Sequence, residues 1–168
     1  MKQFLHLITF SFVLLFSSSL FSQQLKTNAF FLELGGISPQ YSINYEKIFA
    51  QNRSIALASR MGASFTRSTA SIPVGISLIT VPGIHHLQFT VGVTPFVDAY
   101  DSFTIQGSDT YLYLDSGLGY RFENSRIPFF GFVTANPLLK LDPTVDSLLG
   151  NNDEEFIFSV GVAFGYKW

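Results

Sequence analysis

Two adjacent histidines, His85 and His86, are the first candidates for chemistry in this sequence. A histidine can act as general base for a serine nucleophile, or it can bind a metal ion through a ring nitrogen. Both histidines follow the turn-forming pair Pro82-Gly83, and no serine stands at an obvious partner spacing. Neighbouring residues of a strand point to opposite faces, so the two rings make a poor metal pair. We therefore interpret them as polar residues at a strand start and predict no catalytic residue, no metal site and no cofactor.

The other motifs of catalytic or binding proteins are also missing from the sequence. It contains no cysteine, which excludes disulfides, thiolate zinc sites, cysteine nucleophiles and a lipid-modified N-terminal cysteine. The glycines at Gly35-Gly36 and at Gly117 and Gly119 do not form a nucleotide-binding fingerprint, and we read them as strand glycines. We expect a protein that is not an enzyme.

The composition narrows the class of protein further. Of the 168 residues, 13% are charged, against roughly 25% in soluble domains, and 16% are aromatic. The mean hydropathy is +0.29 and the formal net charge is −2. A disordered chain would be less hydrophobic and more charged, and a nucleic-acid binder would carry basic residues to neutralise phosphates. Neither class fits, so we expect one ordered domain and no nucleic-acid partner.

The N-terminus resembles a secretory signal peptide. Lys2 is followed by an almost wholly apolar run from Phe4 to Phe16 and then by a serine-rich stretch ending at Ser22. The alternative is a permanent membrane helix, but the run of about 13 residues is shorter than the roughly 20 that span a bilayer. We therefore predict a signal peptide over residues 1–22 and a single exported domain over residues 23–168.

The last segment of the chain shows the clearest periodicity. From Phe156 to Trp168 the even positions are large and apolar, whereas the odd positions are mostly small. Alternation with period two indicates a strand, and small residues on the second face suit the crowded interior of a narrow barrel. Seven other segments follow the same pattern. The predicted strands are residues 30–35, 41–49, 55–65, 74–78, 87–94, 111–122, 127–136 and 156–168.

The connections between these segments alternate in length. Short gaps at Ala50–Arg53, Pro82–Ile84 and Glu123–Arg126 alternate with gaps that grow to Tyr100–Asp109 and Pro137–Glu154. Outer-membrane barrels have short periplasmic turns and longer outer loops. Beyond the leader, the sequence has no run of 18 apolar residues that could form a membrane helix. We predict an all-β fold, an eight-stranded antiparallel up-and-down transmembrane β-barrel.

A set of polar residues falls on the face predicted to point inward. An eight-stranded lumen is too narrow for an open channel, so these groups must pair with one another or with water. One hypothesis is a purely structural network. The other is a switchable pair of Arg60 with Glu46 or Glu33, whose rearrangement would open a small pore. The predicted lumen network is Glu33, Asn44, Glu46, Arg60, Gln88, Asp98, Asp115, Arg121 and Lys167.

Several segments also resemble a known family. The tail Phe158–Trp168, the segment Leu114–Phe122 and the pair Ile72–Leu78 and Leu87–Thr94 resemble the small outer-membrane β-barrel proteins common in Bacteroidetes, which are loosely similar to the OmpA transmembrane domain and OmpX. The resemblance implies that the terminal aromatic is part of the signal recognised by the barrel-assembly machinery, although Trp168 stands where phenylalanine is usual. The predicted membrane-facing row is Phe158, Val160, Val162, Phe164, Tyr166 and Trp168.

These observations predict a small, non-enzymatic protein in the outer membrane of a Gram-negative cell, with a structural or surface-interaction role. Its expected partners are the lipid bilayer, lipopolysaccharide and the assembly machinery, while no external partner can be named. Three alternatives compete: a narrow pore or transport accessory, a lipid-modifying enzyme, and a soluble lipocalin-like binder. The binder would need its apolar faces turned inward around a ligand.

Overall fold

The computed structural model describes residues 25–38, 40–99, 108–141 and 155–168. The predicted leader over residues 1–22 lies outside these residues, as does most of the two longest predicted loops. The described part of the chain contains no helix that could span a lipid bilayer.

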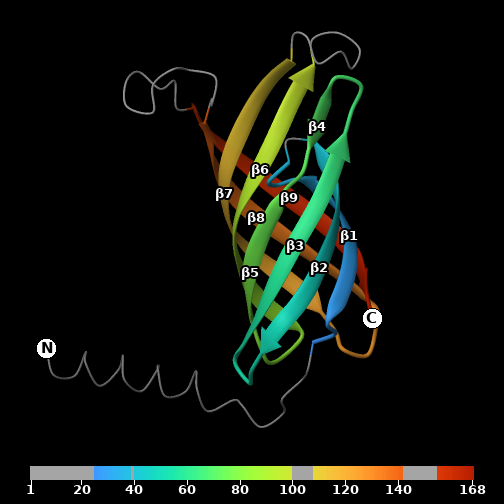
Figure 1. Cartoon of the computed structure of the whole chain (residues 1–168). Coiled ribbons are helices and arrows are strands. Elements are labelled where there is room, and N and C mark those ends of the chain that lie inside the picture. Colours follow the sequence, from blue (N-terminus) through green and yellow to red (C-terminus); the bar gives the residue numbers. More distant parts are fainter. Residues whose placement is uncertain (1–24, 39, 100–107, 142–154) are drawn as a thin grey trace, which may run out of the picture.

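The fold is a closed antiparallel β-barrel (Figure 1), which confirms the predicted fold class. Nine strand segments form the wall, and the pairing of β1 with β9 closes it. Two short segments, β4 and β5, are the halves of one barrel strand, because both pair with β3 and β6. They are interrupted at Pro73, which has no N–H to donate. The wall therefore has eight strands. The segments are β1 (Asn28–Gly35), β2 (Tyr41–Gln51), β3 (Ile55–Phe65), β4 (Thr69–Ser71), β5 (Val74–Thr80), β6 (His85–Ala99), β7 (Ser108–Glu123), β8 (Phe129–Leu141) and β9 (Glu155–Lys167).

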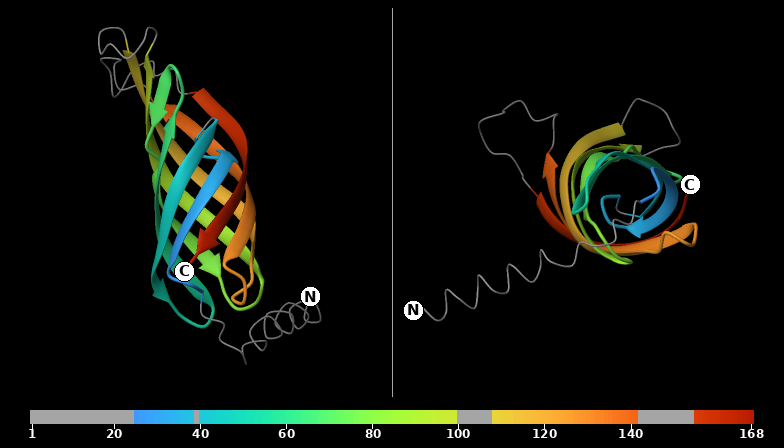
Figure 2. Two further views of the ribbon diagram at one scale, coloured as in Figure 1. Left: turned by 90° about the vertical axis from the view of Figure 1, so that its right-hand side faces the viewer. Right: turned by 90° about the horizontal axis from the view of Figure 1, so that it is seen from below.

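The strands are tilted and staggered around the barrel axis, as the views of Figure 2 show. A path of paired residues that starts at Ala29 and passes through every strand reaches β9 at Ile157. Across the closing seam, however, Ala29 pairs with Lys167, which is ten residues further along β9. A stagger of this kind accompanies the tilt of about 35–45° that lets a sheet close on itself.

The two ends of the barrel differ. At the end that we call the turn end, short connections join β2 to β3, β5 to β6 and β7 to β8, and both Leu25 and Trp168 lie there. We call the opposite end the loop end. On that side β6 and β7 reach furthest (Figure 1). The predicted alternation of short and long connections fails at one place, because only residues 66–68 join β3 to β4 at the loop end, as few as the residues 52–54 that join β2 to β3 at the turn end.

Several strand boundaries differ from the predicted ones, most of them because the strands are longer; β6, for example, runs over His85–Ala99 rather than residues 87–94. The strand predicted over residues 127–136 begins at Phe129 and runs to Leu141, past Pro137. Pro137 has no residue opposite it on β7, but it pairs with Phe158 on β9, so the ladder with β9 carries the strand past the proline. Glu123, predicted in a turn, is the last residue of β7. Part of the loop predicted over residues 67–71 is β4.

Small residues on the inner face leave room for the larger ones beside them. A Cβ atom at Gly165 would come within 2.6 Å of the Phe130 ring and of Cβ of Phe31. A Cβ atom at Gly161 would stand 2.8 Å from Oγ1 of Thr134 and 2.9 Å from Oε1 of Glu33. The glycines of β9 thus fit the interior that the sequence pattern indicated.

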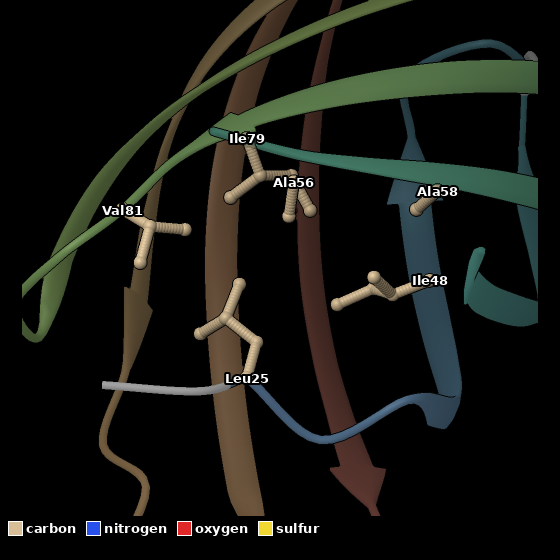
Figure 3. Close-up of a cluster of buried hydrophobic side chains, with 6 residues drawn as sticks. All are labelled: Leu25, Ile48, Ala56, Ala58, Ile79 and Val81. Carbon is tan, nitrogen blue, oxygen red and sulfur yellow. The ribbon is translucent and has the colours of Figure 1, made fainter. Parts of the chain in front are cut away.

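A cluster of apolar side chains fills the lumen at the turn end (Figure 3). Leu25, which precedes β1, turns its side chain into the barrel and is only 3% exposed. It packs there against side chains from β2, β3 and the end of β5. Together they form an apolar cluster that closes this part of the turn end. The cluster is Leu25, Ile48, Ala56, Ala58, Ile79 and Val81.

The crowding at Gly165 gives a test of the interior packing. We expect Gly165→Ala to lower the free energy of unfolding by about 1–3 kcal/mol, because the new methyl group would collide with Phe130 and Phe31. Gly131→Ala is the matched control, since a Cβ atom there would meet only the carbonyl oxygen of Ala163, at 3.2 Å. Urea titration followed by circular dichroism measures both. Equal effects of the two substitutions would contradict the packing described.

Candidate functional site

The lumen holds a cluster of four buried charges near the turn end, which we call the Arg121 cluster. Nη1 of Arg121 donates to Oε1 of Glu46 at 2.7 Å, and Nε donates to Oε2 of Glu123 at 2.7 Å. The other oxygen of Glu123 accepts from Nζ of Lys167 at 2.8 Å. The guanidinium carbon of Arg121 lies 4.2 Å from the centre of the Phe130 ring. Two positive and two negative groups are thus balanced within one chain of hydrogen bonds.

A second ion pair lies nearer the middle of the lumen, and we call it the Arg60 pair. Nη2 of Arg60 is 2.5 Å from Oε2 of Glu33 and 3.1 Å from Oδ1 of Asn44. The guanidinium carbon lies 5.1 Å from the centre of the Phe31 ring. All three polar side chains are at most 2% exposed. Both arginines therefore combine ionic contacts with an aromatic face in the barrel interior.

These contacts join strands that are not neighbours in the wall. The Arg60 pair links β1 to β3, and the bond between Glu46 and Arg121 links β2 to β7 across the lumen. Glu46 stands directly opposite Arg60 in the register of β2 and β3, yet each bonds to another partner. The bond between Glu46 and Arg121 therefore reaches the opposite wall, and the Arg60 pair joins two strands that are separated by β2.

Some buried polar atoms of the lumen form no hydrogen bond with another protein group. Among the described residues, four buried side-chain atoms have no partner: Oε1 of Glu33, Oε2 of Glu46, Nε of Arg60 and Oδ1 of Asp115. Asp115 does accept from Oγ1 of Thr94, at 3.4 Å, through its other oxygen. The ion pairs fix the barrel interior without satisfying every polar atom in it.

The structure brings most residues of the predicted lumen network together. Asp98 differs, because it is only half-buried near the loop end of β6, on the face that carries Thr94. Of the two acids considered as partners of Arg60, Glu33 forms the ion pair, whereas Glu46 binds Arg121 instead. The pore hypothesis stays a prediction. The buried members of the predicted set are Glu33, Asn44, Glu46, Arg60, Gln88, Asp115, Arg121 and Lys167.

Several polar residues of the lumen, among them Glu123 and His86, were not in the predicted network. Glu123 was predicted in a turn. It stands two residues after Arg121 on β7, so its side chain points to the same inner face. His86 points to the same inner face as Gln88, two residues further along β6. Its Nδ1 lies 2.5 Å from the carbonyl oxygen of Thr80, and its Nε2 lies 3.4 Å from that of Glu123. The same period-two rule, carried a step further along each strand, would have found both.

The two histidines point to opposite faces of β6, as the strand alternation predicts. His86 is buried in the lumen, whereas His85 is exposed and stacks against Tyr120 on the outside. Within the described ranges, no three histidine, aspartate or glutamate side chains are grouped so that they could hold a metal ion.

The outside of the barrel is apolar. The predicted membrane-facing residues of β9, from Phe158 to Trp168, have exposed fractions between 46% and 65%. At the turn end, Trp168 lies against a cluster of outward rings, with ring centres 5.4 Å from Phe30, 6.5 Å from Tyr45 and 6.2 Å from Tyr166. The wall thus carries large apolar side chains on its outer face, while two ionic groups, the Arg60 pair and the Arg121 cluster, are buried inside it.

Comparisons with known proteins identify no relative. No protein-family model, no curated protein and no solved structure matches the chain. The eight-stranded barrel itself is compatible with a small outer-membrane protein, and the resemblance to the family of small outer-membrane barrels stays a prediction.

The Arg60 pair makes a test of the buried charges possible. We expect Arg60→Met to lower the free energy of unfolding by about 3–5 kcal/mol, because the Glu33 carboxylate would stay buried without its partner. Adding Glu33→Gln to this variant removes that charge and restores part of the loss. Met61→Ala, on the outward face of the same strand, is the control and changes stability much less. Strictly additive losses from the two lumen substitutions in a urea titration would refute the pairing.

Proposed function

We propose that this protein is a small integral outer-membrane β-barrel with a structural or surface-interaction role and without enzymatic activity. The observation that carries the proposal is the distribution of side chains across the wall. Large apolar residues cover the outside, whereas glutamate, arginine and lysine are buried inside. In a bilayer an apolar outer face needs no polar cover, and a closed barrel leaves no unpaired sheet edge in the lipid.

The same distribution argues against the soluble-binder alternative. A lipocalin-like protein holds an apolar ligand in an apolar interior and shows a polar outside to water. Here the Arg60 pair lies near the middle of the lumen and the Arg121 cluster lies nearer the turn end, so an apolar ligand would meet buried charges. The outside would expose Phe158, Phe164 and Leu118 to water, each by more than 60%.

The proposed orientation puts the turn end in the periplasm and the loop end at the cell surface. Short turns on the inner side and longer connections on the outer side are the usual arrangement in outer-membrane barrels. In this orientation the bilayer and lipopolysaccharide surround the wall, and the terminal row from Phe158 to Trp168 is available to the barrel-assembly machinery. Contacts with external partners would then be made by the connections at the loop end.

Fractionation and gel mobility test the proposal directly. We expect the expressed protein in the outer-membrane fraction, with folded protein migrating faster on a gel than boiled protein, because a closed barrel binds less detergent. Protease treatment of intact cells should cut the chain between residues 142 and 154. Recovery of the protein in the soluble periplasmic fraction, without detergent, would overturn the membrane assignment.

Introducing a lysine on the outer face tests whether that face is surrounded by lipid or by water. Val162 lies in the middle of β9 and is 53% exposed, so Val162→Lys should cost about 2–4 kcal/mol for a protein unfolded from lipid vesicles. Ile127→Lys, in the connection between β7 and β8 at the turn end, should cost about 0–1 kcal/mol. If both lysines are tolerated equally, the middle of the wall faces water.

A further inference from the structure

Exposed charges are distributed unevenly between the two ends of the barrel. Exposed basic side chains gather at the turn end, in the connections below the strands and on the lowest part of β2. Of the acidic residues in that half of the described chain, Glu46 and Glu123 are both buried in the Arg121 cluster. Among the described residues, the charged side chains exposed at the turn end are therefore all basic. We call these residues the basic rim: Lys26, Lys47, Arg53 and Arg126.

The loop end carries charges of both signs. Among described residues, the acidic positions Asp98, Asp109 and Glu155 all lie at the loop ends of their strands, where the basic residues are Arg67 and Lys140. The described basic residues of the loop end thus stand beside acidic positions, whereas those of the turn end do not.

An apolar groove begins beside the basic rim on the outer face. It has a volume of about 740 Å³ and runs over β2, β3, β5 and β6. At its turn-end side it is lined by Tyr45 and Ser59, and Ser59 is the register partner of Lys47. A cationic side chain thus stands next to a hollow that is apolar along its length. The outward side chains lining the rest of the groove are Met61, Val74, Ile76, Val91 and Val93.

We propose that the basic rim and this groove together bind an anionic phospholipid of the leaflet at the turn end. The phosphate and negative headgroup lie against Lys47 and Lys26, and one acyl chain lies in the groove. Basic residues at a membrane surface attract anionic lipids, by about fivefold in affinity for each charge. A soluble acidic partner would use the rim but not the groove, which is why the observations favour a lipid. This inference rests on the proposed membrane location.

Trp168 provides a built-in probe of the site. It is the single tryptophan of the chain, and it is 46% exposed on the outside at the turn end. Its ring lies 6.5 Å from that of Tyr45, which lines the groove. Asn28, whose backbone bonds to Trp168, is the register partner of Lys47. A quencher carried by a lipid at the rim would therefore lie close to the indole ring.

The test uses the protein without residues 1–22, folded into phosphatidylcholine vesicles. Brominated phosphatidylglycerol or brominated phosphatidylcholine is added in increasing proportion, and the quenching of Trp168 fluorescence is recorded. We expect the anionic lipid to compete for the site several-fold better than the zwitterionic one at low salt. The double variant Lys26→Gln with Lys47→Gln should remove most of this preference. The matched control, Arg67→Gln with Lys140→Gln, loses the same charge at the loop end and should keep it.

The outcomes separate the two proposals. Strong and equal quenching by both lipids in the wild type would overturn the lipid site while leaving the membrane location intact. No quenching by either lipid would mean that Trp168 is not in contact with lipid, and both proposals would fail. Loss of the preference in the loop-end control as well as in the rim variant would show that net charge acts and that the rim does not bind a lipid.

Discussion

The closure of the sheet by β1 and β9 is the constraint on which the rest of the structure depends. Without that pairing, two strands of the wall would have unpaired edges, and the inner face would be open on one side. The stagger of ten residues at the seam sets the tilt of every strand and the width of the lumen. A lumen this narrow admits only side chains, which is why glycine and alanine occupy the inner face of β9 from Gly161 to Gly165 and why Gly165 faces the Phe130 ring.

Once the wall is closed, the charges inside it must balance one another. Glu123 accepts from both Arg121 and Lys167, and Arg60 takes Glu33 as its partner, so each cation in the lumen has an acid within 2.8 Å. Because the contacts cross between strands that are not neighbours, they hold the barrel in one shape as well as neutralising charge. The apolar outside has no such internal partner, and its counterpart in our proposal is the hydrocarbon of a membrane.

Much of this arrangement could be predicted from the sequence, because the side chains of a strand alternate between its two faces whatever the strand pairs with. The alternation from Phe156 to Trp168 defines two faces, and the same rule predicted the inward direction of Glu33, Arg60 and Arg121. Their partners were less predictable, because contacts across a lumen depend on the stagger of the barrel, which no local pattern contains. The strand past Pro137 was missed for a related reason, since the ladder with β9 overrides the local tendency of proline to end a strand.

The two ends of the described chain meet at the turn end, where Asn28 and Trp168 exchange backbone hydrogen bonds of 3.3 and 2.9 Å. The wall is therefore a closed ring of strands, and its first and last strands, β1 and β9, are hydrogen-bonded neighbours. A short linker joining Trp168 to the residues before Asn28 would leave every pair of strands in place, and the chain could then be opened at another connection. The barrel thus has a circular order of strands, and β1 is only one of several strands with which the wall could start.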